Sequence, residues 1–197
     1  PNALHKAYVI RAAKAKKHVI VEKLKLLEPF YRAKGLDLFA NPISVTPPGG
    51  EALTPVLQSQ LRQPYVVLHP GPLNGYKRWP LAYWAQLIKE LVALKYQVVL
   101  SASPAEQDLA LNRDIVSLLD HEVVPSVVDS KGQLNLPKVK TLLDGATLYI
   151  GVDTSVTHLA AACEIPTIAL FGPTPPTNFG PWPNGFIVER PYQLRSR

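Results

Sequence analysis

The sequence predicts an α/β protein built on an open, Rossmann-like parallel sheet with helices on both faces. Three observations indicate this class. Strand-like and helix-like segments alternate from residue 65 to residue 171. Each strand-like segment is apolar along its whole length, as in sheets whose two faces are both covered. Prolines and glycines separate the segments, as they do at turns.

The expected strands are short apolar runs rich in β-branched residues, starting with YVVLH, which ends at a Pro-Gly turn. They span residues 65–69, 96–101, 122–128, 147–152 and 167–171. The expected helices between them show apolar residues at helical spacing. They span residues 80–94, 105–119, 136–144 and 155–163. Pro80 fits the first position of its helix, and Gly145 fits the C-cap of the third.

The chain before residue 65 differs in composition. Residues 3–34 are rich in Ala, Leu, Lys and Glu and predict helix, which Pro29 should kink or restart. Residues 41–64 hold five prolines and the pair Gly49-Gly50, a composition typical of a linker, with room for a short helix over 50–62. The chain begins at Pro1 and contains no methionine, so a fragment of a longer protein is expected.

The positive charge lies in one part of the chain. Residues 1–40 carry nine Lys or Arg against three Asp or Glu, which accounts for the whole net charge of +6. The excess indicates either a solvated helix face or a surface that meets an anionic membrane or glycolipid. Nucleic acid is not an expected partner, because the remaining residues are neutral and show no basic stripe interleaved with aromatics.

Several function classes are excluded. The single Cys163 rules out a disulfide scaffold and a cysteine-based metal cluster, and it is expected in the core. No run approaches eighteen apolar residues, so no membrane span is expected. The sequence has no HExxH motif and no Asp-x-Asp cluster, so neither a metal site nor a cofactor is expected.

The candidate site follows the carboxyl ends of the strands, where open parallel sheets bind their ligands. Asp153, Thr154 and Ser155 lead into a helix whose first N–H groups could bind phosphate, and His158 projects from the same turn. The alternative is an ordinary N-cap with a surface histidine.

The other strand ends offer further candidates. Lys77 and Arg78 could neutralise a diphosphate or be solvated. Glu106 either satisfies its helix dipole or accepts ribose hydroxyls. His69 and Trp79 are expected to be structural.

The segments HPG (69–71), KRWP (77–80), PAE (104–106) and GVDTSVTHLAAACEIPTIALFGPT (151–174) together resemble the lipopolysaccharide heptosyltransferases. These bacterial glycosyltransferases use ADP-heptose and related sugars. The resemblance covers residues 65–183 well and 17–38 more loosely. It implies a GT-B enzyme of two Rossmann-like domains facing a cleft, of which this chain is the C-terminal, donor-binding half.

The resemblance also implies roles for residues. Asp153 would hold sugar hydroxyls, while the amides of Thr154 and Ser155, together with His158, would bind the diphosphate. Lys77 would lie at the junction of phosphate and sugar. The catalytic contribution of Lys77 and His158 would be to stabilise the leaving group. Glu106 would bind the ribose, and Leu134 would lie near the adenine.

The expected function is the donor-binding part of an inverting transferase that moves heptose from ADP-heptose to a lipopolysaccharide core acceptor. The expected location is the cytoplasm, with peripheral contact at the inner membrane. The family's general base, an aspartate near the start of the first domain, would be absent, so the chain alone is expected to be inactive. The alternatives are a nucleotide-sugar epimerase that binds a UDP-sugar and a binding fragment without activity.

The expected division of the chain follows from the same resemblance. Residues 1–40 would be a basic helical segment at the end of a preceding N-terminal domain. Residues 41–64 would be the proline-rich linker, and residues 65–190 the nucleotide-sugar-binding domain.

Overall fold

The computed structural model describes residues 9–11, 18–40, 43–71, 75–182 and 185–189. Its strands are β1 (Val9–Arg11), β2 (Tyr65–His69), β3 (Gln97–Leu100), β4 (Val127–Asp129), β5 (Leu148–Val152), β6 (Thr167–Phe171) and β7 (Phe186–Glu189). Its α-helices are α1 (Val19–Lys25), α2 (Glu28–Ala33), α3 (Pro55–Gln60), α4 (Leu81–Ala93), α5 (Glu106–Ser117), α6 (Leu136–Asp144), α7 (Ser155–Ala162) and α8 (Pro176–Phe179). Two short 3₁₀ helices are η3 (Gly75–Lys77) and η4 (Val124–Ser126).

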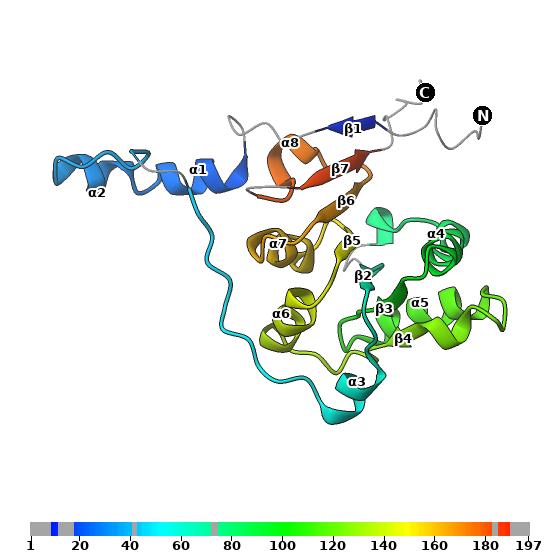
Figure 1. Ribbon diagram of the computed structural model, residues 1–197. Coiled ribbons are helices and arrows are strands. Elements are labelled where there is room, and N and C mark those ends of the chain that lie inside the picture. The colour runs from blue at the N-terminus through cyan, green and yellow to red at the C-terminus, as the bar shows by residue number, and fades with distance from the viewer. Residues whose placement is uncertain (1–8, 12–17, 41–42, 72–74, 183–184, 190–197) are drawn as a thin grey trace, which may run out of the picture.

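The strands form one sheet in the order β1-β7-β6-β5-β2-β3-β4 (Figure 1). The six strands from β7 to β4 are parallel, and β1 pairs antiparallel with β7 at one edge. Strands that are distant in sequence are therefore neighbours, with β2 between β3 and β5. The predicted class, a Rossmann-like parallel sheet, is confirmed.

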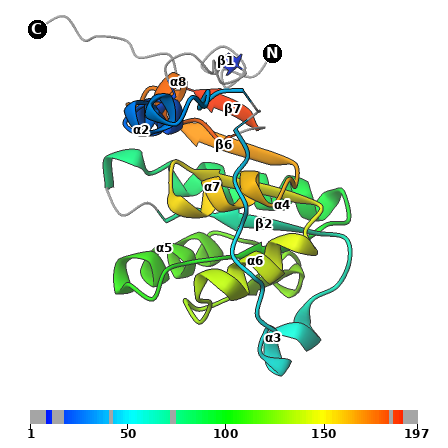
Figure 2. The same cartoon turned by 90° about the vertical axis from the view of Figure 1, so that its left-hand side faces the viewer.

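Two apolar layers hold the helices against the sheet, one on each face (Figures 1 and 2). Alternate residues of a strand point to opposite faces. Val67 therefore packs in the layer under α6 and α7, whereas its neighbour Val66 packs in the layer under α4 and α5. Trp84 of α4 is fully buried, and Trp79 packs edge-on against it at 5.0 Å between ring centroids. Trp79 is thus structural, as predicted.

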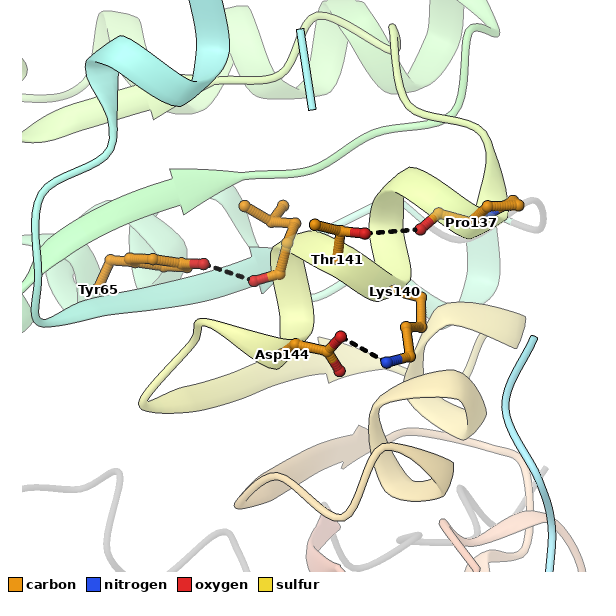
Figure 3. A network of polar contacts seen from close by, with 6 residues as sticks. Tyr65, Pro137, Lys140, Thr141 and Asp144 are labelled. Carbon is orange, nitrogen blue, oxygen red and sulfur yellow. Dashed lines mark hydrogen bonds and ion pairs between the residues drawn. The ribbon is translucent and has the colours of Figure 1, made fainter. Parts of the chain in front are cut away.

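Helix α6 is fixed to the amino end of β2 (Figure 3). The hydroxyl of Tyr65 donates a hydrogen bond to the carbonyl of Leu142 at 2.6 Å. Burial, together with the charge of Asp144, raises the pKa of Tyr65 to about 12, which keeps this donor protonated. Lys140 and Asp144 form an ion pair one turn apart on the same helix. These contacts lie at the end of the sheet opposite to the candidate site.

The proline-rich segment before β2 is docked rather than free. The N–H group of Glu51 donates to the carbonyl of Pro137 at 3.3 Å, and Asn135 donates to the Glu51 carboxylate at 3.0 Å. The predicted short helix within it is present as α3, capped by the hydroxyl of Thr54. The linker therefore runs along α6 before it enters the sheet.

Four predictions of local structure were wrong. Pro80 is the N-cap of α4, whereas the first helical position was expected. Val9–Arg11 form strand β1 where helix was expected, because pairing with β7 outweighs local helix propensity. The strand expected over 122–128 begins at Val127, since Val124–Ser126 form η4. The strand predicted as the last one, 167–171, is followed by α8 and β7.

Helices α1 and α2 extend away from the sheet (Figure 1), and neither contains a buried residue. Pro29 lies at the start of α2, so it restarts the helix as predicted. Leu26 and Phe30 are each 69% exposed. Within the described residues, no helix is long and apolar enough to cross a membrane.

Candidate functional site

The centre of the candidate site is an ion pair between the ends of two neighbouring strands. Lys77 ends η3 in the loop after β2, and Asp153 directly follows β5. Lys77 Nζ lies 2.6 Å from Asp153 Oδ2, and the two side chains are 18% and 9% exposed. Because β2 and β5 are adjacent and parallel, two residues 76 positions apart meet at the carboxyl ends of these central strands.

Helix α7 begins beside this pair. Thr154 occupies its N-cap in an extended conformation, but its side chain makes no capping hydrogen bond. Ser155, the first helical residue, is exposed. The first N–H groups of a helix have no partner within it and carry a partial positive charge. Since the side chain of Thr154 does not cap these groups, the helix start can bind an anion such as phosphate.

Two hydrogen bonds that run from Tyr149 through Thr157 to Val152 hold the turn from β5 to α7, and we call this arrangement the Tyr149 brace. The Thr157 hydroxyl donates to the carbonyl of Val152 at 2.5 Å, so it accepts from the Tyr149 hydroxyl at 2.9 Å. Tyr149 is fully buried, and burial raises the pKa of its hydroxyl. Gly151 leaves room for this contact, because a Cβ at Gly151 would lie 2.2 Å from the Tyr149 hydroxyl oxygen. The brace fixes the residues that start α7.

His158 is half-buried on the first turns of α7. Burial lowers its pKa, and the nearby His18 and Lys77 lower it further, while the Asp153 carboxylate acts in the opposite direction. The imidazole is therefore neutral at pH 7. A neutral histidine offers one N–H donor and adds no charge to the site.

His18 joins the surroundings of this site from a remote part of the chain. It is fully buried, and its Nε2–H donates to the carbonyl of Gly180 at 2.7 Å. Its Nδ1 accepts from the N–H of Ile20 at 3.3 Å, which fixes the tautomer, and its ring contacts Trp182. The start of α1 is thereby attached to the segment between α8 and β7.

His69 ends β2 and is 6% exposed, so the prediction of a core histidine is confirmed. The Ser101 hydroxyl donates to the carbonyl of Leu68, and therefore accepts from His69 Nδ1–H at 2.9 Å. Burial lowers the pKa of His69 to about 4, although the charge of Asp108 opposes this shift. His69, the last residue of β2, is consequently neutral at pH 7.

We expect the free energy of unfolding to fall as the pH drops below about 6.5, the ordinary histidine pKa. In the unfolded chain His69 binds a proton below this pH, whereas in the folded chain it stays neutral down to about pH 4. The difference corresponds to about 3 kcal/mol lost between these pH values, and His158 acts in the same direction. Urea unfolding at pH 7 and pH 4.5 measures this loss.

His69→Asn should remove most of this pH dependence, whereas His121→Asn, at an exposed position, should leave it unchanged. An unaltered slope in His69→Asn would contradict the assignment.

Two predicted site residues have contacts of their own outside the ion pair. Glu106 begins α5, after β3, and its exposed carboxylate pairs with Arg113. Leu134 is 8% exposed and packs in the apolar layer under α6 and α7. It also lines a groove of about 650 Å³ between α3 and β4. Arg78 is exposed next to Lys77.

The arrangement combines a cation, a carboxylate, a neutral imidazole and an uncapped helix start at the carboxyl edge of a parallel sheet. Such groups can bind a diphosphate and stabilise negative charge that develops on it. Within the part of the chain that the structure describes, no group of three His, Cys, Asp or Glu residues is placed to hold a metal ion.

The fold defines a Rossmann-like α/β domain of the kind found in GT-B glycosyltransferases. The chain belongs to glycosyltransferase family 9, the heptosyltransferases, whose sequence profile matches residues 2–190. It is 37% identical over 125 residues to lipopolysaccharide heptosyltransferase 3 of Escherichia coli. That alignment covers 64% of this chain and 36% of the relative.

Two solved structures support the assignment of the fold. The E. coli ADP-heptose lps heptosyltransferase II is 28% identical with a TM-score of 0.62, covering 66% of this chain and 40% of that chain. The E. coli heptosyltransferase WaaC with ADP is 24% identical with a TM-score of 0.66, covering 90% and 52%. The chain thus spans about a third to a half of the length of these relatives.

Proposed function

We propose that this chain is the donor-binding part of an inverting heptosyltransferase that moves heptose from ADP-heptose to a hydroxyl of a lipopolysaccharide core. The observation that carries the proposal is the Lys77–Asp153 ion pair beside the uncapped start of α7. Family membership supports ADP-heptose as the donor. It also favours a transferase over the epimerase alternative.

The residues would act on the diphosphate. Lys77 would hold the phosphate next to the sugar, and the N–H groups at Thr154 and Ser155 would bind its remaining oxygens. His158 would donate its single N–H. The Tyr149 brace holds the start of α7 in place before the nucleotide sugar binds. Groups that are already oriented stabilise charge that develops on the diphosphate without having to rearrange.

The reaction would proceed by displacement. The acceptor oxygen attacks the anomeric carbon of heptose, the bond from that carbon to the β-phosphate oxygen breaks, and ADP leaves with the bonding electrons. The acceptor proton passes to a general base. We place that base outside these 197 residues, in agreement with the resemblance. Asp153 would bind sugar hydroxyls, while Glu106 and Leu134 would contact ribose and adenine.

The division of the chain is part of the proposal. Residues 65–190 would form the donor domain, and residues 41–64 would be the linker, which contacts α6 through Glu51. Within residues 1–40, α1 and α2 would belong to a preceding domain, whereas β1 pairs with β7 and extends the sheet of the donor domain. The absence of any buried residue in α1 and α2 supports this division, because such helices lack the packing that stabilises a helix inside its own domain.

A paired assay on one preparation tests the function. The 197-residue chain should bind ADP in calorimetry, with a chelator present or absent, and should bind UDP more weakly. The same sample, supplied with ADP-heptose and acceptor, should transfer no heptose. Failure to bind ADP would refute the donor site. Measurable transfer would place the general base within this chain.

The α1–α2 segment would contact an anionic membrane surface. Lys23 and Lys25 of α1 are exposed and supply the positive charge for this contact. Each basic residue near such a surface contributes about 1 kcal/mol. Replacing both lysines by glutamine should therefore reduce co-sedimentation with phosphatidylglycerol vesicles at least about tenfold at low salt.

The matched control replaces Lys95 and Lys131, which are exposed on the sheet domain, by glutamine. If both double variants lose vesicle binding equally, total charge rather than this segment is responsible.

A further inference from the structure

The ion pair at the candidate site places a negative charge where a negative ligand is proposed to bind. The Asp153 carboxylate is 9% exposed and lies 2.6 Å from Lys77 Nζ. His158 is neutral because burial lowers its pKa, so it does not offset the carboxylate. The charges of Lys77 and Asp153 therefore cancel each other before any ligand binds.

A phosphate bound by Lys77 must lie close to Asp153. The lysine ammonium has three donors, so it can hold the carboxylate and a phosphate oxygen at the same time. A charge-assisted N–H···O bond spans about 2.8 Å. With Asp153 Oδ2 at 2.6 Å from the same nitrogen, the two anionic oxygens are at most about 5.5 Å apart. Charges at this distance repel appreciably at a partly buried site.

The strength of this repulsion depends on whether the terminal phosphate carries a sugar. A free terminal phosphate has a second ionisation near pH 6 and carries a charge close to −2 at pH 7.5. When the phosphate is esterified to a sugar, that ionisation is absent and the charge is −1. The carboxylate therefore disfavours a free nucleoside diphosphate more than a nucleotide sugar.

We propose that Asp153 determines ligand specificity at this site by disfavouring free ADP relative to nucleotide sugars, which promotes release of the product. The inference rests on the proposed function, because it requires a diphosphate at Lys77. Asp153 would thus have two roles: it would contact the sugar hydroxyls, and its negative charge would disfavour free ADP. The bond between sugar and phosphate breaks during transfer, so the repulsion increases when the product forms.

The test compares ADP with its β-methyl ester, which has the charge of a nucleotide sugar but no sugar hydroxyls. Calorimetry at pH 7.5 would measure both ligands on the wild-type chain and on Asp153→Asn. Asparagine keeps the size of the side chain and an oxygen that Lys77 can bond. We expect the variant to bind ADP about tenfold more tightly and the methyl ester about threefold more tightly, in proportion to the charge of the terminal phosphate.

The matched control is Asp144→Asn, which removes a carboxylate from the other Lys–Asp pair, at the opposite end of the sheet. It changes the net charge equally and should leave both affinities unchanged. Asp153→Ser, with no carbonyl oxygen to hold Lys77, serves as a second variant, and thermal unfolding verifies that each is folded.

The outcomes separate the two proposals. If the wild-type chain binds neither ligand, the proposed donor site itself fails. If it binds ADP, but Asp153→Asn binds ADP no more tightly or gains equally for both ligands, the specificity role of Asp153 is refuted.

Discussion

Replacing Lys77 by alanine should weaken ADP binding about 100-fold. A hydrogen bond to a charged group contributes about 1.5–3 kcal/mol, and tenfold in affinity corresponds to about 1.4 kcal/mol. The substitution also leaves the Asp153 carboxylate, 9% exposed, without its cation. The unpaired carboxylate would then repel the phosphate directly. Titration calorimetry with ADP measures the effect.

Lys140→Ala is the matched control, because it also removes a lysine from an ion pair with aspartate but at the opposite end of the sheet. It should leave ADP affinity unchanged. The double variant Lys77→Ala, Asp153→Asn should recover part of the lost affinity, since the repelling charge is gone, and the cycle isolates the coupling between the two residues. A loss of less than threefold in Lys77→Ala would mean that the phosphate does not bind there.

The sheet domain could be predicted largely from local patterns. Apolar runs and proline–glycine boundaries identified β2, β3, β5 and β6, because buried parallel strands leave a signal in the sequence itself. The pair β1 and β7 was missed because its partners are about 180 residues apart. The run Phe-Ile-Val after Gly185 was the available signal for β7.

The candidate site could also be predicted in part, because the strands that carry its residues could be predicted. Lys77 and Asp153 both follow predicted strands. The rule that ligands bind at the carboxyl ends of parallel strands therefore predicted that both belong to one site. The rule does not say which way a side chain points. Glu106 follows a strand as well, yet it is exposed and paired with Arg113. Its place in the donor site stays a prediction.

The supporting residues could not be predicted from strand ends. His18 reaches the site through contacts with Gly180 and Trp182, and no local pattern indicates such a pairing. Tyr149 left a weaker signal. It lies two residues before Gly151 on the same strand, so both face the same side of the sheet, and a glycine there gives space to a bulky neighbour.

Gly151→Ala should therefore lower the free energy of unfolding by about 3 kcal/mol, the upper range for overpacking a buried site. The added Cβ would lie 2.2 Å from the Tyr149 hydroxyl oxygen and 2.6 Å from its ring. The ring cannot move aside freely, because Tyr149 is fully buried and bonded to Thr157. Denaturant unfolding measures the loss. Gly49→Ala, at a position with open space, should have little effect on stability.

The same substitution should also weaken ADP binding, because displacing Tyr149 releases Thr157 and with it the residues that start α7. Tyr149→Leu shortens the side chain and removes the atoms that the new Cβ meets. In the double variant Gly151→Ala, Tyr149→Leu, the cost of Gly151→Ala should be smaller than in the wild-type background. If the alanine costs the same in both backgrounds, the clash with Tyr149 is not the cause. If stability falls but ADP affinity does not, the brace under β5 supports the fold without positioning the anion site.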